Sequence, residues 1–590
     1  MTTARAIAFG LTLLLVACRS APVAPTRPVL ELESLIAAPN GEVRAVGEIT
    51  SDALRPPVLQ PGERWLVSPK GPLDGAELTR LLHEQQLPGL SLRDRDDVTP
   101  AVISSLGALP SLRSLDLSNS TIGDAELSAI ISQAPQLEWL DVSQSRISDT
   151  SAPKIAELNG LQVLRASSTR FSDAALISFA TIVSLQQLDL RGCKLGAQLP
   201  QLRTLVKLKA LALSDTGVDN AGLVALDDMR ELQVLLLSNT RVGDAGMAHL
   251  RNLEHVTLLD LGGTQITDAG LIGLEHALGL TGLSLAKTAI TDATVVRIGA
   301  LKHLAQLSLG RTRVSDVGVA ALKSLVELRE LNLASTGATD ASADVLASFA
   351  KLEQLTLDGT NTSAATLAKI SKLPLRQLSV SGCRVEPGGL AQIGALADLE
   401  ELDVSTSRLH GADLSPLERL RHLRVLSLAG TDLDPSQLGH IARISSLREL
   451  DVSDDSIGDD GLARLEPLHT LEQLGIGRDL LDDAGLLHLQ AFPALSVLSL
   501  NVNGIGDSTL EKLPPHLAVL GLTSTGLDDA GVQKLARLAQ LHTLALAGDA
   551  ITDASVAALL SFPRLRKLDV RQTQLVEGRK RLAERFELVP

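Results

Sequence analysis

One unit of about 24 residues recurs along most of this chain, and its clearest copy is LLDLGGTQITDAGLIGLEHALG, from Leu258 to Gly279. A unit this short cannot bury its own apolar residues, so successive units must stack on one another. Each unit holds an apolar pair whose first leucine marks its phase. These twenty leucines fall at 115, 140, 164, 188, 211, 235, 259, 283, 307, 331, 355, 378, 402, 426, 450, 474, 498, 520, 544 and 568. The period therefore predicts a solenoid, which reuses one leucine-sized slot in every layer.

Each unit divides into a strand, a turn and a short helix. The alternation L-x-x-L-x-L has period two, which is typical of a short strand with its leucines pointing inward. The phrase T-D-A-G-L-x-x-L follows, in which Asp or Thr can cap a helix whose leucines dip into the core. Two degenerate units share this phase, at residues 66–82 and 90–106.

These units resemble leucine-rich repeats, whose consensus is L-x-x-L-x-L-x-x-N/C-x-L. They are most similar to the T-x-I-T-D-A-G-L subtype of bacterial proteins and of F-box-associated repeat proteins. The resemblance covers about residues 66–590. It implies an α/β solenoid, a leucine-rich-repeat horseshoe with a parallel β-sheet on the concave face and short helices on the convex face.

The first residues carry a targeting signal. A positive Arg5 precedes the apolar run 7–16, and Leu15-Val16-Ala17-Cys18 places small residues before a cysteine. This resembles the lipobox of bacterial lipoproteins, in which the cysteine becomes the lipidated first residue. Because residue 19 is Arg rather than Asp, the resemblance implies an outer-membrane or cell-surface destination.

These features divide the chain into five parts. We expect a lipoprotein signal peptide at 1–17, followed by lipidated Cys18 and a flexible Pro/Ala-rich tether over 18–45. An N-terminal cap with the degenerate repeats should occupy 46–111, the regular repeats 112–576 and a C-terminal cap 577–590. The degenerate units between Asn361 and His440 are explained either by repeat drift or by a local change of curvature or a partner-contacting insert.

Composition and motifs argue against several functions. The formal charge of −15 disfavours nucleic acid as a partner. No P-loop, nucleotide-binding glycine pattern or nucleophile elbow occurs, so we expect no enzyme and no cofactor. Cys193 and Cys383 lie eight repeats apart, too far for a disulfide, and are interpreted as buried packing thiols.

A regular column of aspartates invites a comparison with calcium ladders. Its members are Asp124, Asp149, Asp173, Asp244, Asp268, Asp292, Asp316, Asp340, Asp459, Asp483, Asp507, Asp529 and Asp553. Calcium needs six to eight converging oxygens, and the column lacks the loop spacing of known motifs. We interpret these residues as helix caps and predict no metal site.

A binding site on the concave face should use the residues that flank each strand's leucine. In the middle of the chain these are small, as in Ser284, Ala286 and Gly310. The N-terminal third is different, since Trp139, Asp141, Arg165, Asp189 and Arg191 should project outward from consecutive strands. We predict this group as a contact patch, because Trp and Arg dominate binding energy. The alternative is a solvated face whose tryptophan is covered by the N-terminal cap.

The sequence leaves three functions open. The first is a monomeric, lipid-anchored protein of the bacterial cell envelope that binds a protein or peptide ligand through its concave face. The second, suggested by the F-box relatives, is a translocated effector or ubiquitin-ligase-type substrate adaptor, but residues 19–65 are too Pro-rich for an F-box module of about 40 residues. The third is a structural envelope protein without a specific ligand.

Overall fold

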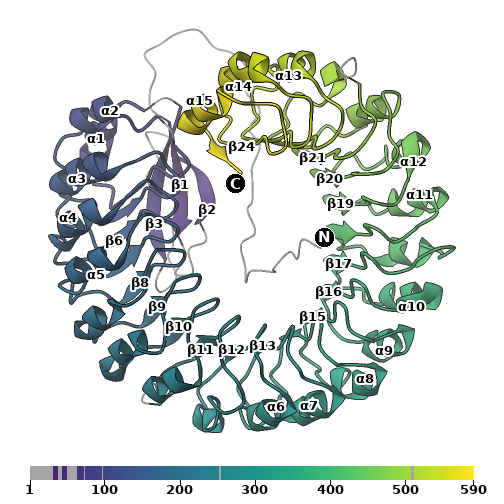
Figure 1. The fold of residues 1–590 in the computed structure, drawn as a ribbon, viewed down its shortest axis with the longest axis horizontal. Coiled ribbons are helices and arrows are strands. Elements are labelled where there is room, and N and C mark those ends of the chain that lie inside the picture. The colour runs from purple at the N-terminus through teal and green to yellow at the C-terminus, as the bar shows by residue number, and fades with distance from the viewer. Residues whose placement is uncertain are drawn as a thin grey trace. The chain divides into compact units, whose positions relative to one another are not determined.

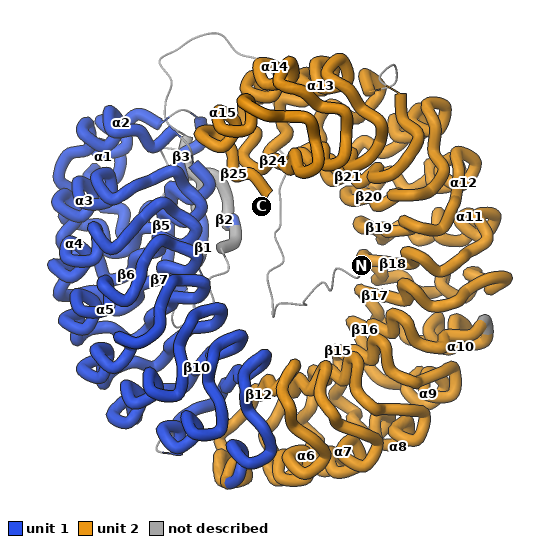
Figure 2. Tube along the Cα trace, in the orientation of Figure 1, with its two compact units in different colours: residues 1–272 blue, residues 273–590 orange. Residues whose placement is uncertain are grey.

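The computed structural model describes residues 31–37, 43–49, 63–71, 73–84, 86–95, 97–251, 254–506 and 510–589. Two compact units divide the chain, residues 1–272 and residues 273–590 (Figure 2). The predicted signal peptide and Cys18 lie outside the described residues.

Unit 1 contains strands β1 to β11. They are β1 (Glu31–Ala37), β2 (Val43–Ile49), β3 (Arg64–Lys70), β4 (Gly89–Ser91), β5 (Ser114–Asp116), β6 (Trp139–Asp141), β7 (Val163–Arg165), β8 (Gln187–Asp189), β9 (Ala210–Ala212), β10 (Val234–Leu236) and β11 (Leu258–Asp260). From β3 to β11, each strand pairs in parallel with the strand that follows it, and from β4 to β11 the central leucines of paired strands are aligned.

The two N-terminal strands correct one predicted boundary. Strand β1 pairs antiparallel with both β2 and β3, which builds a three-stranded cap on the first repeat. The flexible tether expected to run to residue 45 is therefore wrong over β1 and the start of β2. Sequence periodicity could not reveal β1 and β2 because these two strands lie outside the repeats.

Unit 2 continues the same architecture in strands β12 to β25. They are β12 (Gly282–Ser284), β13 (Gln306–Ser308), β14 (Glu330–Asn332), β15 (Gln354–Thr356), β16 (Gln377–Ser379), β17 (Glu401–Asp403), β18 (Val425–Ser427), β19 (Glu449–Asp451), β20 (Gln473–Gly475), β21 (Val497–Ser499), β22 (Val519–Gly521), β23 (Thr543–Ala545), β24 (Lys567–Asp569) and β25 (Glu587–Leu588). Each pairs in parallel with the next.

Helices lie on the opposite side of each unit from the strands (Figure 1). Unit 1 contains α1 (Gly75–Glu84), α2 (Pro100–Ser105), α3 (Asp124–Gln133), α4 (Ala152–Ala156) and α5 (Asp173–Phe179); unit 2 contains α6 (Asp292–Ile298), α7 (Asp316–Ala321), α8 (Ala343–Leu346), α9 (Ala364–Ile370), α10 (Glu386–Ile393), α11 (Leu438–Ile441), α12 (Gly458–Arg464), α13 (Asp529–Leu535), α14 (Val556–Ser561) and α15 (Gly578–Arg585). Other repeats use a 3-10 helix instead, as at Gly222–Asp228. The predicted α/β solenoid is confirmed.

The core consists of stacked leucines. In β14, Leu331 is buried while Glu330 and Asn332 on either side remain partly exposed. The helices contribute the other wall, as Leu346 of α8 does. Each layer is thus closed only by its neighbours, as the short period predicts.

The aspartate column joins consecutive repeats, which the capping interpretation missed. Thr339 caps its own helix segment through a bond from the Ala341 amide. It also donates its amide and hydroxyl to the two carboxylate oxygens of Asp316, one repeat earlier, at 2.8 and 2.7 Å. The same clamp joins Asp124 to Ser148, Asp149 to Ser172, Asp244 to Thr267, Asp292 to Ser315, Asp340 to Ser363 and Asp529 to Thr552.

The two inner cysteines behave as packing groups. Both are free and buried. The Cys193 thiol donates to the carbonyl of Ala166, and the Cys383 thiol to that of Leu357, each in the preceding repeat. Burial, the largest influence, raises the pKa of Cys193, which opposes a reactive thiolate.

Candidate binding surface

The register of β6, β7 and β8 brings the predicted contact residues together. Asp141 pairs with Arg165, and Arg165 pairs with Asp189 on the next strand. Trp139 lies at the start of β6, and Arg191 follows β8 by two residues. The sequence therefore placed these side chains on one strip of unit 1.

The prediction that Trp139 projects into solvent is wrong. Its side chain is only 4% exposed, and the Arg165 guanidinium carbon lies 5.6 Å from the ring centroid. Arg64, at the start of β3, is close enough to Glu138 and Arg165 for both to act on its pKa. The guanidinium of Arg165 thus lies over a buried indole. Cover by the N-terminal cap, the alternative that the sequence left open, stays a prediction.

The burial of the strand residues changes along unit 1. All three residues of β4 and of β5 are buried, and the first two residues of β6 and of β7 are also buried. From β8 onward only the central leucine is buried, and both flanking positions become partly exposed. The open part of the sheet in unit 1 therefore begins at β8.

Two acidic side chains lie beneath the covered strip. Asp116 accepts bonds from the amide and hydroxyl of Ser118 at 3.0 and 2.6 Å. Burial, opposed by these bonds, raises the pKa of Asp116. Burial together with the charge of Asp116 raises the pKa of Asp141 to about 6, although Arg165 acts against this. Asp116 is buried and Asp141 is only partly exposed, so this acid pair offers little contact surface.

Asp189 and Arg191 form an ion pair at the edge of the covered strip. The Arg191 Nη2 lies 2.6 Å from Asp189 Oδ2, and the arginine side chain remains 44% exposed. The hydrogen bonds to Asp189 raise the pKa of Arg191. Of the five predicted contact residues, Arg191 is the one that the structure leaves most open to a partner.

A larger open surface lies on the strands of unit 2. From β14 to β20, both flanking positions of each strand are at least partly exposed while the central leucine is buried. The residue that precedes the leucine forms a column of amides and carboxylates: Gln306, Glu330, Gln354, Gln377 and Glu401, then Glu449 and Gln473. Gln306 Nε2 donates to Glu330 Oε1 at 2.8 Å, so neighbours in this column interact. We call this column, together with Asp358, Glu400, Asp403 and Asp451, the acidic amide face.

The acidic residues of this face are crowded. Asp358 accepts bonds from the Ser379 hydroxyl at 2.5 Å and the Ser381 amide at 3.0 Å. Burial raises the pKa of Asp358, and the charge of Asp403 adds to the shift. Burial and then the charge of Glu400 raise the pKa of Glu401. Carboxylates held in this way gain from a cationic partner.

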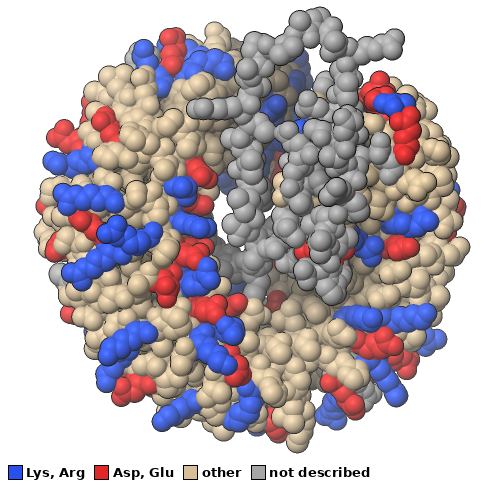
Figure 3. All heavy atoms as spheres, turned by 180° about the vertical axis from the view of Figure 1, so that it is seen from behind, with Lys and Arg blue, Asp and Glu red and all other residues tan. Residues whose placement is uncertain are grey.

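This column was not predicted from the sequence, because the prediction considered the residue after each leucine, where small side chains are common. The signal was available one position away, in the residue before the leucine. Charges of both signs are otherwise interspersed over the visible surface of the repeats (Figure 3). Many pair between neighbouring repeats, as Lys351 does with Glu327 at 2.6 Å.

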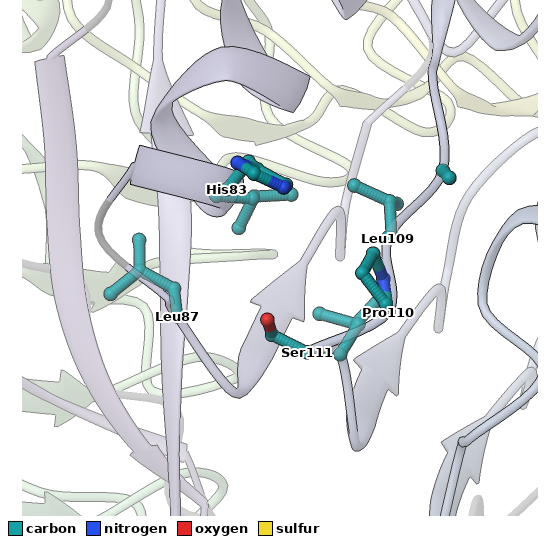
Figure 4. Close-up of a pocket in the computed structure, with 8 residues that line it drawn as sticks. His83, Leu87, Leu109, Pro110 and Ser111 are labelled. Atoms are coloured by element: carbon teal, nitrogen blue, oxygen red, sulfur yellow. The ribbon is translucent and has the colours of Figure 1, made fainter.

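A small hollow on unit 1 offers little for a ligand. It lies beside α1, has a cavity volume of only about 10 Å³ and is lined by His83, Leu87, Leu109, Pro110 and Ser111, among others (Figure 4). Small-molecule sites usually enclose about 300–1,000 Å³. Across the described part of the chain, no three His, Cys, Asp or Glu residues gather as metal ligands would. No described helix has the length and apolarity needed to span a membrane.

Comparison with known families bears on the repeats directly. Residues 193–456 match a model described as a leucine-rich repeat region, and residues 108–130 match a leucine-rich repeat model. Over these two ranges the chain is similar to leucine-rich repeats, in agreement with the α/β solenoid that its strands and helices form. A comparison with curated proteins finds no match.

Solved structures of leucine-rich-repeat proteins are also similar to this chain. An internalin from Listeria monocytogenes has 26% sequence identity and a TM-score of 0.42, with 54% of this chain and 87% of the internalin covered. The Arabidopsis receptor kinase HAESA, solved with a peptide hormone and a co-receptor, has 16% identity and a TM-score of 0.39; 86% of this chain and 85% of HAESA are covered.

Proposed function

We propose that this protein is a non-enzymatic, lipid-anchored leucine-rich-repeat protein of the bacterial cell envelope that binds a protein or peptide through the acidic amide face of unit 2. The main support for this surface comes from strands β14 to β20. In each of them the central leucine is buried, and the side chains on either side of it remain at least partly exposed. Leucine-rich-repeat proteins generally mediate protein or ligand binding, which supports the same class of function.

The chemistry of this face favours an extended, basic segment of the partner. Parallel strands lie about 4.8 Å apart, so Asp403 and Asp451, two strands apart, present carboxylates at about 10 Å spacing. In an extended polyproline II segment, which has three residues per turn and a rise of about 3.1 Å, basic side chains three residues apart recur on one side at about the same distance. Amides such as Gln377 can bond the partner's backbone between these charges. In unit 1 we retain Arg191 as a second candidate contact.

The lipid anchor rests on the sequence around Cys18. The Pro/Ala-rich residues between Cys18 and β1 would act as a short tether that holds the repeats off the membrane. An outer-membrane or cell-surface position would leave the acidic amide face available to a partner in the envelope or outside the cell. The F-box alternative gains no support, since the described residues before α1 form strands β1 to β3.

Site-specific photo-crosslinking in cells tests the binding surface. A photoreactive residue at Gln377 or Glu401 should trap one partner, whereas the same residue at Val296 of α6 should not. Val296 is a matched control because it is 59% exposed and lies on the helix side of unit 2. Two outcomes would refute the proposed binding surface: capture of the same partner from position 296, or no capture from either position 377 or position 401.

A charge variant adds a test of partner chemistry. Glu401→Gln together with Asp403→Asn removes two charges and keeps the side-chain shapes. We expect the amount of partner trapped from Gln377 to fall severalfold and its salt sensitivity to weaken. Undiminished capture would show that the charges do not recruit the partner.

A further inference from the structure

The fourth residue after each strand forms an inward-facing turn column, and most of its members donate a hydrogen bond. Thr525, after β22, donates its hydroxyl to the Leu522 carbonyl at 2.7 Å. Thr288 and Thr312 make the same bond to the carbonyl three residues before them, at 2.6 Å each. A donor at this position satisfies a buried backbone oxygen in layer after layer.

Asn503 fills the same position after β21 and shows what an amide does there. Its Oδ1 accepts from the amides of Asp479 and Leu481, at 3.0 and 3.2 Å. Its Nδ2 donates to the Leu500 carbonyl at 3.0 Å and to the Ile476 carbonyl at 2.7 Å. The amide oxygen therefore accepts hydrogen bonds from the preceding turn, while the amide nitrogen donates hydrogen bonds to two carbonyl groups.

Three aspartates occupy this column where a donor is expected. Asp455, Asp479 and Asp549 are 6%, 0% and 3% exposed. Asp455 Oδ1 accepts from the amides of Thr431 and Leu433 at 2.8 and 3.3 Å, repeating the accepting half of the Asn503 pattern. In all three, the buried Oδ2 has no hydrogen-bond partner.

The missing bond has a simple chemical explanation. Since Oδ1 of the aspartate does what Oδ1 of Asn503 does, Oδ2 takes the place of the amide nitrogen, which faces carbonyl oxygens. A carboxylate oxygen cannot donate, and an unsatisfied buried charge costs far more than a neutral group. A carboxylic acid can donate from Oδ2 and completes the column.

We propose that Asp455, Asp479 and Asp549 are carboxylic acids in folded unit 2, each donating from Oδ2 to turn carbonyls as Asn503 does, and that unit 2 loses stability as rising pH ionises them. This makes the C-terminal repeats a pH-sensitive element. It is independent of what the concave surface binds.

The electrostatic surroundings agree with this assignment. Burial raises the pKa of Asp455 to about 6, and burial with the charge of Asp455 raises that of Asp479 to about 7. Burial also raises the pKa of Asp549. Backbone amides, together with the hydroxyls of Thr431 and Thr525, oppose these shifts. Among the strongest influences on these three groups in the described chain, the carboxyl of Asp455, once ionised, is the one side-chain charge.

The direction of the pH effect follows from proton linkage. An unfolded aspartate has a pKa of about 3.9, so above about pH 4 these three groups hold more protons in folded unit 2 than in the unfolded chain. Stability then falls as pH rises from about 4 to above about 7. A pKa raised by about two units corresponds to an unfolding constant on the order of 100-fold larger at pH 8 than at pH 4.

Denaturation of the full chain at pH 5 and pH 8 tests the proposal. Asp479→Asn supplies a permanent donor, so we expect its midpoint to exceed that of the wild type at pH 8 and to depend less on pH. The triple variant at 455, 479 and 549 should lose most of the pH dependence. Wild-type pH dependence retained in the triple variant would overturn the proposal.

The reverse substitution, Asn503→Asp, protects the test against a variant that fails to fold. We expect it to be tolerated at pH 5 and to unfold more easily than the wild type at pH 8. Infrared difference spectra at pH 5 give a direct measurement, because a protonated acid has its own carbonyl stretch. That band should weaken in Asp479→Asn, and an unchanged band would contradict the assignment of Asp479.

Discussion

Asp316 binds the backbone amide and the side-chain hydroxyl of Thr339 at once, although 23 residues separate them. The pair bridges two layers of the solenoid, so it contributes to the interface between repeats rather than to one helix. Burial would raise the pKa of Asp316, but the bonds from Ser342 and Thr339 outweigh it, and the pKa is lowered. Repeat proteins depend on such nearest-neighbour terms for their cohesion.

Removing one clamp should weaken one interface. We expect Asp316→Ala to destabilise unit 2 by about 1.5–3 kcal/mol, the usual loss for hydrogen bonds to a charged group. Chemical denaturation of Asp316→Ala, Thr339→Ala and the double variant measures the coupling. Additive effects of the two substitutions would mean that the bond contributes nothing.

The glycine of the repeat phrase has a position-specific role. A Cβ on Gly318 would lie 2.3 Å from Oδ1 of the clamp residue Asp292. At the equivalent position one repeat later, Ser342 donates its hydroxyl to Asp316. We therefore expect Gly318→Ala to destabilise the protein and Gly318→Ser to cost less, because only the serine can bond the carboxylate. Equal denaturation midpoints for the two variants would exclude this explanation.

The clamps should make the protein sensitive to strong acid. Burial of Asp340 is outweighed by bonds from Ser363 and Thr366, so its pKa is lowered. A lowered pKa gives stability that is present above the unfolded value of about 3.9 and is lost as pH falls through the folded value. Thermal melting over pH 2–8 should show a loss below about pH 4, and Asp340→Asn should reduce it. A melting temperature that does not fall below pH 4 would contradict this.

Tryptophan fluorescence can check the burial of Trp139. The chain has two tryptophans, so Trp65→Phe isolates the signal of Trp139. At 4% exposure, Trp139 should emit at short wavelength and resist quenching by acrylamide. Trp139→Ala should cost about 3–5 kcal/mol, as for other buried aromatics. Emission typical of indole in water would restore the exposed contact patch predicted from the sequence.

The lipid anchor can be tested by fractionation. Cys18→Ala should move the protein from the membrane fraction to the soluble fraction, while Cys193→Ala, in a buried turn, should not change its location. Metabolic labelling with a fatty-acid analogue should likewise depend on Cys18. Continued membrane association of the Cys18 variant would refute the anchor.

The repeating part of the fold was predictable because each leucine constrains the next. The strands around Leu331 and Leu355 occur in the predicted register, since a slip of one residue would expose the whole apolar row. Trp139 could not be predicted in the same way. A repeat pattern states which way a side chain points, but not whether a neighbouring side chain such as Arg165 will lie over it.

The polar columns were recognised but only partly understood. The aspartates were visible from Asp124 onward, and the column was interpreted as helix caps rather than as a calcium ladder, but its spacing did not reveal the bonding partners. A residue 23 or 24 positions away becomes a neighbour only once the layers are stacked. The orphaned oxygen of Asp479 depends on the same stacking and had no counterpart in the linear pattern.

The clamp between Asp316 and Thr339 also affects how such a chain can evolve. Every clamped repeat offers a carboxylate to the layer after it and an amide with a hydroxyl to the layer before it, so one repeat is complementary to a copy of itself. Duplicating or deleting a whole unit recreates the same junction without any compensating substitution. The length of the binding surface can therefore change by unequal recombination, one strand at a time.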